Sequence, residues 1–427
     1  MLRAYRSALS LPGTFRFSST GFLARLPIAM VGLGIVLLVS ETTGSYAAAG
    51  ALSAAFQLPA ALGAVVTSRW TDRLGQSRTL PWLGGLSASF LVAFVVSVQL
   101  GAPVLVQGLV VACAGLTQPA IGSMVRTRWA ANVADESTLR SAFALESVID
   151  ELIFTIGPLV TAFLAFQLAL PLPLLLAATM GVVGAVLLSL QRHTQPPPSH
   201  HDTQGLEPRR WILAYPGAAL VVLAALGIGS VFGSFEVSVV AFTSEAGAAE
   251  ASGLVLAVYA LGSMLSGIWF GSRHWRMTLG RQMLVLPVLL TAALVLAPFA
   301  PTITLLTIVT AIAGVAVSPT LIASFSLTRR LVPASRLTEG LTWTNSGLAV
   351  GFSMGVALGG IVVDAHGTRW GFTVSIVGAA LASVVGLVGQ GVFAAARAGA
   401  DDAGPPLSYN DDPLPGPQPG GVADDPR

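Results

Sequence analysis

The segment "SRWTDRLGQSR", Ser68–Arg78, separates two long apolar stretches of the chain. It brings together three arginines, one aspartate and one glycine. The apolar stretches on either side cover roughly residues 46 to 67 and 79 to 99, and a membrane-spanning helix needs about 20 such residues. The segment is therefore interpreted as the charged turn of a helical hairpin at a membrane surface.

The composition of the whole chain agrees with a membrane protein. Of 427 residues, 54% are hydrophobic and 10% are charged, and the mean hydropathy is +0.77. Soluble domains are much less apolar. The apolar runs are continuous and not alternating, which indicates helices and not the strands of a membrane barrel. We therefore expect an all-α integral membrane fold.

Twelve candidate spans follow from the apolar runs. They cover roughly residues 22 to 41, 46 to 67, 79 to 99, 103 to 125, 141 to 166, 170 to 190, 214 to 242, 250 to 271, 282 to 299, 302 to 326, 338 to 363 and 370 to 394. Every second connection is rich in arginine, and the remaining connections are nearly free of it. By the positive-inside rule the arginine-rich connections and both termini are cytoplasmic, so we expect a multi-pass protein of the cell membrane.

The chain divides into two similar halves. "AGLTQP" at 114–119 recurs as "AGVAVSP" at 313–319, each late in the fourth span of its half. The spacing predicts an N-terminal six-helix bundle at 1–190 and a C-terminal one at 214–396, related as parallel repeats around a central cavity. A proline-rich cytoplasmic linker at 191–213 joins them, and we expect the tail at 397–427 to be disordered.

The charged turn also carries a family resemblance. Asp72, Arg73 and Gly75 match the loop G-x-x-x-D-R-x-G-R-[RK] of the major facilitator superfamily, although Ser68 replaces its first glycine and Gln76 with Ser77 replaces its basic pair. The loop, together with twelve spans in two parallel halves, resembles the pattern of this transporter family. The resemblance implies the family fold and a role for Asp72 as a conformational latch between the halves. The alternative is that the arginines only set topology.

The fifth span contains three acids, Glu146, Asp150 and Glu151. Glu146 lies near the cytoplasmic end, and we expect a structural ion pair with Arg126 or Arg128. Asp150 and Glu151 lie close to the midplane. No basic residue occurs in the interior of any predicted span, because Arg25 is expected to stay near the surface, so at least one of the two acids should hold a proton near neutral pH. They are the predicted proton-coupling residues. The alternative is an acid that is hydrogen-bonded to a neighbouring helix and never titrates.

Further polar groups are expected at the cavity. In this family the first, fourth, seventh and tenth spans line it, so the resemblance places Glu236 of span seven there; alternatively, Glu236 reaches water at the outer end. Gln118 and Ser318 are expected to face each other across the cavity. Pro119 and Pro319 beside them leave backbone carbonyls free for neighbours or substrate.

Small residues in two spans indicate close helix packing. Span eleven carries a ladder formed by Gly347, Gly351, Gly355 and Gly359. In span five, Gly157 and Pro158 resemble the core of the antiporter signature of drug-efflux members, but the other glycines of that signature are absent. Span four also lacks the arginine that many proton-driven members have.

The sequence favours a secondary transporter over other membrane proteins. We expect proton-coupled efflux of small amphipathic or cationic compounds by alternating access, with uptake symport of a metabolite as the alternative. An enzyme would need a catalytic constellation that no loop offers, and without lysine the chain has no P-loop for an ATP-driven pump. A receptor would leave the repeat unexplained. We expect a monomer whose partners are substrate, protons and lipid, with no cofactor, metal or nucleic acid.

Overall fold

The computed structural model describes residues 8–197, 212–215, 217–271, 275–332 and 337–394, and every regular element among them is helical. Among these residues, twelve helical segments are long and apolar enough to cross a membrane, so the protein is an all-α, multi-pass membrane protein and the predicted number of spans is confirmed. The predicted linker falls largely, and the predicted tail entirely, outside the described residues.

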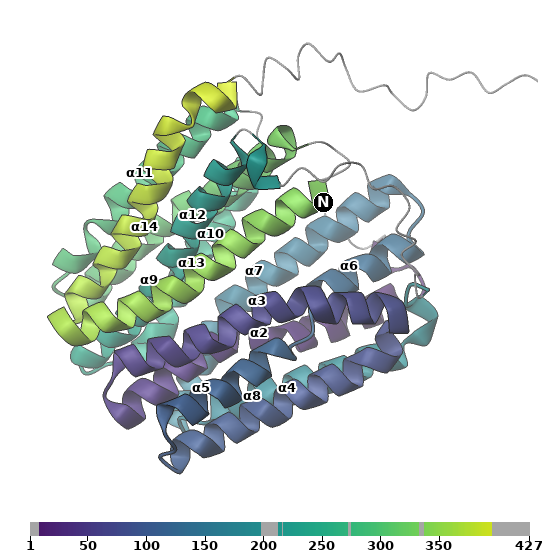
Figure 1. The fold of residues 1–427 in the computed structure, drawn as a ribbon, viewed down its shortest axis with the longest axis horizontal. Helices are drawn as coiled ribbons and strands as arrows, with labels where there is room; N and C mark the ends of the chain where they lie inside the picture. The colour runs from purple at the N-terminus through teal and green to yellow at the C-terminus, as the bar shows by residue number, and fades with distance from the viewer. Residues whose placement is uncertain (1–7, 198–211, 216, 272–274, 333–336, 395–427) are drawn as a thin grey trace, which may run out of the picture.

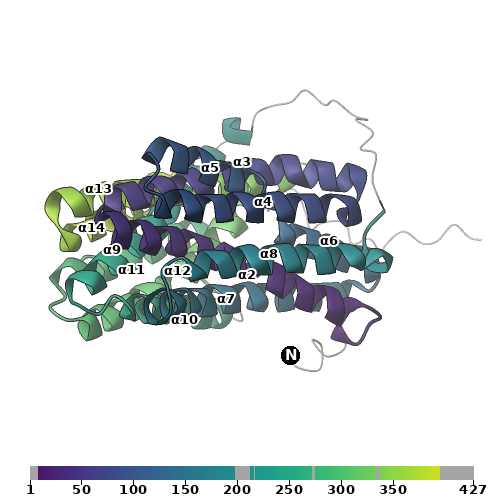
Figure 2. The same ribbon diagram turned by 90° about the horizontal axis from the view of Figure 1, so that it is seen from below.

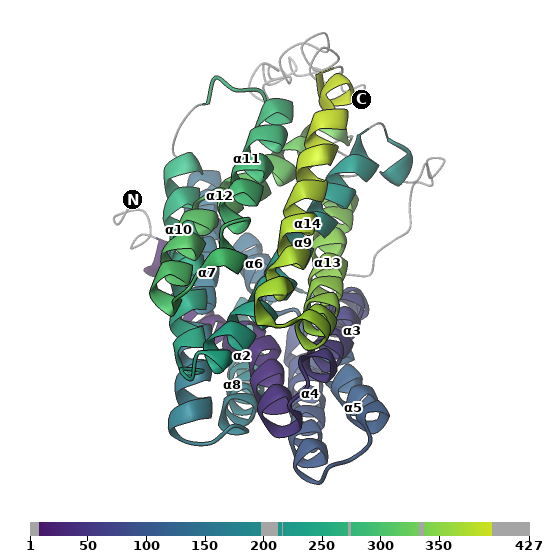
Figure 3. The ribbon, with the colours of Figure 1, turned by 90° about the vertical axis from the view of Figure 1, so that its left-hand side faces the viewer.

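The helices form two bundles that lie side by side (Figure 1). The first contains α2 (Thr14–Thr43), α3 (Tyr46–Leu74), α4 (Gln76–Gln99), α5 (Val104–Leu116), α6 (Ile121–Asn132), α7 (Glu136–Gln167) and α8 (Leu172–Leu190). The second contains α9 (Ala218–Glu245), α10 (Ala251–Gly271), α11 (Leu279–Leu294), α12 (Ile303–Leu331), α13 (Leu337–His366) and α14 (Thr368–Val388). Figures 2 and 3 show the same division from two further directions. Between the bundles α3 packs along α13, and α7 packs along α10.

Two spans differ from their predicted form. The first helix begins at Thr14 instead of near residue 22, so it carries Arg25 well inside its length. The fourth span is two helices, α5 and α6, separated by the stretch 117–120. Pro119 lies in this break, and because proline has no backbone N–H it cannot continue the helical hydrogen bonding.

The charged turn has the geometry that the sequence predicted. Gly75 alone separates α3 from α4, with a backbone φ of 86° that a residue with a side chain rarely adopts. Its N–H donates to the Thr71 carbonyl over 2.8 Å. Arg73 is exposed, and the side chain of Asp72 lies outside the described part of the structure.

The end opposite the arginine-rich connections is where the two bundles are hydrogen-bonded. Asp364, near the end of α13, accepts from the Ser45 hydroxyl at 2.8 Å and from the backbone N–H groups of Tyr46 and Ala47 at 2.9 and 2.8 Å. The Ser244 hydroxyl of α9 donates to Glu41 of α2 over 3.2 Å. These contacts close this end, which we call the outer end.

The glycine ladder of α13 lies against α9 within the second bundle. A Cβ at Gly347 would approach the Val222 carbonyl oxygen to 2.7 Å, and one at Gly351 would overlap the Leu226 carbonyl oxygen. Gly355 and Gly359 meet the backbone of α9 in the same way. Helices approach this closely only where side chains are absent.

Candidate functional site: the central cavity

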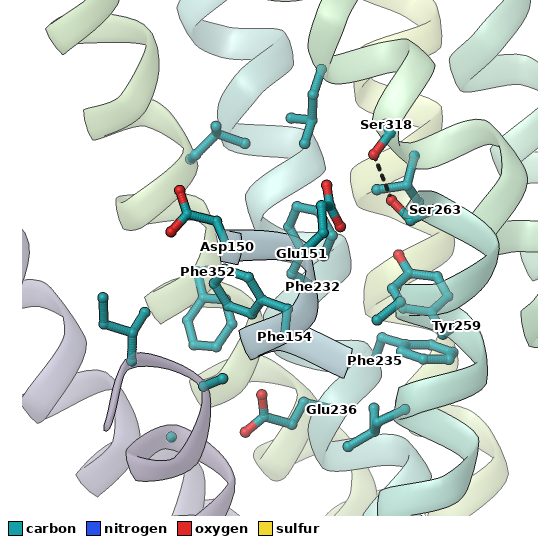
Figure 4. Close-up of a pocket in the computed structure, with 18 of the residues that line it drawn as sticks. Asp150, Glu151, Phe154, Phe232, Phe235, Glu236, Tyr259, Ser263, Ser318 and Phe352 are labelled. Carbon is teal, nitrogen blue, oxygen red and sulfur yellow. Dashed lines mark hydrogen bonds between the residues drawn. The ribbon is translucent and has the colours of Figure 1, made fainter. Parts of the chain in front are cut away.

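A cavity of about 840 Å³ lies between the two bundles. Helices α2, α3, α6 and α7 of the first bundle and α9, α10, α12 and α13 of the second contribute its walls. Its walls are mostly apolar and include aromatic side chains from both bundles, namely Phe154, Phe232, Phe235, Tyr259, Phe325 and Phe352 (Figure 4). Two of these rings are in contact, because the centroids of Phe235 and Tyr259 are 4.5 Å apart.

Asp150 does have basic partners, contrary to the expectation from sequence. Arg25 Nη1 of α2 donates to Asp150 Oδ1 over 2.8 Å, and Arg126 Nη2 of α6 donates to Asp150 Oδ2 over 2.7 Å. Arg25 is only 1% exposed. The early start of α2 places Arg25 about 16 Å along the helix, where it faces the acids of α7 instead of the membrane surface.

The predicted ion pair of Glu146 with Arg126 or Arg128 is wrong. Glu146 is completely buried, and its Oε2 atom is paired with Arg25. Its Oε1 atom accepts from the Ser18 hydroxyl at 2.7 Å and from Trp129 Nε1 at 2.8 Å. A buried carboxylate needs both a counter-charge and hydrogen bonds, and the long side chain of Arg25 supplies the charge from the adjacent helix.

Arg128 has a different role from the one predicted. Its guanidinium donates to Gln76 Oε1 over 2.6 Å, to the Gln191 and Leu188 carbonyls over 2.9 Å each, and to Thr194 Oγ1 over 2.8 Å. It therefore attaches the charged turn after α3 to the end of α8 and to the first residues of the predicted linker. Gln76, which replaces a basic residue of the family loop, is the acceptor that makes this contact.

Arg25 and Arg126 together balance the charges of Glu146 and Asp150, so this cluster contains no spare positive charge. Arg126 is also the one basic residue among the described residues that line the cavity. Glu151, next to Asp150, faces the cavity without an ion pair or side-chain hydrogen bond within the described structure. An acid without a counter-charge is costly in a low-dielectric site, and a bound proton or cation would lower that cost.

Glu236 of α9 also lines the cavity, at a different level from Asp150 and Glu151 (Figure 4). Its Oε1 atom is buried and has no hydrogen-bond partner in the described structure. The alternative, in which Glu236 reaches water at the outer end, disagrees with this position. Two acids of the cavity wall, one from each bundle, therefore lack basic partners.

The expected pair of Gln118 and Ser318 is not formed. Ser318 lines the central cavity and shares a 2.8 Å hydrogen bond with Ser263 of α10 (Figure 4). Gln118 and Pro119 instead line a separate pocket of about 30 Å³ inside the first bundle. The break between α5 and α6 turns this stretch away from the cavity, whereas α12 continues as a helix through Pro319, which is buried.

Of the small pair in α7, Gly157 packs on Ala29 of α2 and Pro158 lines the cavity.

The sequence interpretation missed Arg25, Ser53, Gln57 and the aromatic wall. The signal for Arg25 was its position as the basic residue beside the first apolar run. The signal for Ser53 and Gln57 was their spacing, because two polar residues four positions apart in an apolar helix lie on one face. Within the described residues no cluster of His, Cys, Asp and Glu could hold a metal ion.

Comparison with known proteins decides the family. The model of the Major Facilitator Superfamily matches residues 17–279, which is more than half of the chain. The chain belongs to the Major Facilitator Superfamily. No curated protein sequence matches it significantly.

Solved structures of this superfamily share the fold. A variant of the nucleoside transporter NupG has a TM-score of 0.71 at 14% identity, over 89% of this chain and 99% of that chain. A bacterial homologue of the human lysosomal transporter Spinster, inward-facing and unoccupied, has a TM-score of 0.67 at 17% identity, over 92% and 98%. A bacterial metal transporter has a TM-score of 0.61 at 18% identity, over 88% and 98%. At these identities the likeness establishes the fold alone.

Proposed function

We propose that this transporter is a proton-coupled exporter of small amphipathic cations that works by alternating access. The observation that carries the proposal is the pair Glu151 and Glu236, which face a largely apolar cavity without basic partners in the described structure. Membership of the superfamily supports transport as such.

The cavity walls favour a substrate with an apolar body and a positive charge. Phe232, Phe235, Tyr259 and Phe352 offer aromatic faces, which attract both apolar groups and cations. The cavity's one described base, Arg126, is occupied by Asp150. An anionic substrate would therefore meet Glu151 and Glu236 without a free counter-charge, and it would be repelled.

Proton coupling follows from competition for the same carboxyl groups. A carboxylate in this cavity is stabilised either by a proton or by a cationic substrate, and one site cannot hold both well. When the cavity opens alternately to the two sides of the membrane, the carboxylate exchanges the cationic substrate for a proton. This exchange is antiport. Glu151 is the proposed proton-coupling residue in place of Asp150, because Arg25 and Arg126 already neutralise Asp150.

The distribution of arginine supports the proposed orientation. With the arginine-rich connections in the cytoplasm, both termini are cytoplasmic and the outer end faces away from the cell interior. The contacts of Asp364 then close the cavity on the outside, as expected of an inward-facing state. We propose a monomer in the cell membrane, because one chain encloses the whole cavity.

The test is transport of a panel of lipophilic amines into inside-out vesicles that have an acidic lumen, measured as the excess over vesicles without the protein, because an acidic lumen by itself traps weak bases. We expect uptake by the parent protein that collapses when the proton gradient is removed. Glu151→Gln and Glu236→Gln should each lower gradient-driven uptake by about tenfold or more, because the amide cannot exchange a proton. Arg281→Gln, which alters an exposed arginine near the start of α11, outside both the cavity and the charged turn, is the charge-change control for membrane insertion. Uptake that stays gradient-driven in both glutamine variants would refute the proposal.

A further inference from the structure

Four residues of the two bundles form a small polar notch at the outer side of the cavity. They are Gly32 of α2, Ser53 and Gln57 of α3, and Glu236 of α9. A Cβ built on Gly32 would lie 3.0 Å from Gln57 Nε2, 3.4 Å from Glu236 Oε1 and 3.9 Å from Ser53 Oγ. The polar atoms thus converge on the face of α2 where residue 32 has no side chain.

The notch is polar, buried and incompletely hydrogen-bonded. Ser53 is completely buried, and its hydroxyl has no hydrogen-bond partner in the described structure; the same holds for Glu236 Oε1. Buried polar atoms almost always have a partner, and atoms that lack one need an explanation. Gly32, Gln57 and Glu236 all line the central cavity, so a group bound there would be continuous with a molecule in the cavity.

We propose that this notch is the subsite for the protonated primary amine of the transported cation, an inference that rests on the proposed function. A primary ammonium group is a compact donor of three hydrogen bonds, and Glu236 Oε1, the amide oxygen of Gln57 after rotation of its amide, and Ser53 Oγ are three acceptors. The carboxylate of Glu236 supplies the counter-charge. The apolar body of the same molecule lies against Phe232, Phe235 and Phe352 (Figure 4).

The shape of the notch sets a specificity. The polar atoms of Gln57, Glu236 and Ser53 lie close together, within 3.0 to 3.9 Å of the Cβ position of Gly32. A quaternary ammonium group has three methyl groups in place of donors, so it neither fits nor forms hydrogen bonds. The subsite therefore selects a protonated primary amine over a quaternary ammonium ion with the same apolar group. The aromatic wall alone would accept both.

The subsite also depends on the closed outer end. Gly32, Ser53 and Gln57 belong to the first bundle and Glu236 belongs to the second, so separation of the bundles at this end removes the counter-charge from the other acceptors. The amine is then released toward the side on which the bundles separate. Alternating access thus assembles the subsite in one state and dismantles it in the other.

Equilibrium binding to the purified full-length protein in detergent tests the subsite without any proton gradient. The probes are phenylbutylamine, its trimethylammonium analogue and phenylbutanol, measured by calorimetry. We expect the parent to bind phenylbutylamine about tenfold more tightly than either of the other two, the effect of a charge-assisted hydrogen-bonded group. Gly32→Ala fills the notch and Ser53→Ala removes one acceptor. Each should abolish this preference while leaving phenylbutanol binding within about twofold.

Gly85→Ala is the matched control, because a Cβ at Gly85 meets no atom within 4 Å, and its binding should equal that of the parent. Equal binding of the three probes by the parent refutes the subsite, as does an amine preference that survives both Gly32→Ala and Ser53→Ala. Loss of the preference when sodium chloride replaces N-methylglucamine chloride would show a sodium site instead. If the parent prefers the amine in binding but shows no gradient-driven uptake in vesicles, the proposed function is refuted and the subsite is supported. If uptake is gradient-driven but binding shows no amine preference, the subsite alone is refuted.

Discussion

Arg25 in α2 and Asp150 in α7 are joined by a 2.8 Å ion pair between residues 125 positions apart in sequence. The same guanidinium is paired with Glu146, and Arg126 holds the other oxygen of Asp150. Two bases and two acids thus form one neutral cluster beside the cavity. This arrangement removes Asp150 from the set of unpartnered acids and leaves Glu151 and Glu236.

Replacement of Arg25 by methionine should destabilise the protein severely. Glu146 is completely buried, and removal of one partner of a buried pair costs about 3–5 kcal/mol. Thermal unfolding of the purified protein in detergent measures the effect, with the exposed Arg73→Met as control. The double variant Arg25→Met with Glu146→Gln should recover part of the loss. Equal unfolding temperatures for the parent and Arg25→Met would contradict the assigned role.

Replacement of Asp364 by alanine should loosen the outer end. The change removes the carboxylate that accepts hydrogen bonds from one hydroxyl and two backbone N–H groups. It also removes a negative charge from the positive N-terminal end of α3. Because the group is exposed, we expect a population shift on the order of tenfold at most. Electron–electron distance measurements between spin labels at Thr43 and Ala365, in a Cys113→Ala background, should gain a longer distance.

Glu250→Ala is the matched control for that measurement, because Glu250 is an exposed acid at the same end with no partner in the described structure. Its distance distribution should equal that of the parent. An unchanged distribution in Asp364→Ala would mean that other contacts hold the outer end closed.

Replacement of Gly351 by alanine should weaken the packing of α13 on α9. The added Cβ would overlap the Leu226 carbonyl oxygen, and overpacking of this kind typically costs about 1–3 kcal/mol. Gly85→Ala adds the same atom where nothing lies within 4 Å, and it should be neutral or slightly stabilising because alanine favours helix. Thermal unfolding compares the two variants, and similar unfolding temperatures would contradict the close contact.

Replacement of Asp72 by asparagine should slow turnover and leave substrate affinity nearly unchanged. The charged turn of this chain keeps Asp72 and Arg73, and a latch between the halves acts on the conformational step and not on the cavity. Initial rates and binding constants for the same amine measure the two effects separately. A large loss of affinity in Asp72→Asn would contradict the latch.

The local features of the fold were predictable because each depends on a short stretch of chain. Continuous apolar runs predict spans, since every backbone polar group in lipid must be bonded within its helix. The turn at Gly75 follows from the conformational freedom of glycine. Errors appeared at helix ends: the first helix begins earlier than its apolar run, because its first turns contain Arg16 and four hydroxyl residues.

The site was less predictable because its contacts are long-range. Arg25 was recognised as basic but was expected at the surface, and only the packing of α2 on α7 brings it to Glu146 and Asp150. Gln118 and Ser318 occupy equivalent positions in the repeats, yet the helix breaks at one and continues at the other. Equivalent sequence therefore did not give equivalent geometry.

The sequence by itself determined a twelve-helix membrane protein with a charged hairpin turn and acids inside the bilayer, because hydropathy and glycine act locally. Only the tertiary structure decided which acids are neutralised and which face the cavity. The reason is physical: an ion pair in low dielectric depends on the distance between side chains of different helices, and that distance is set by how the helices pack.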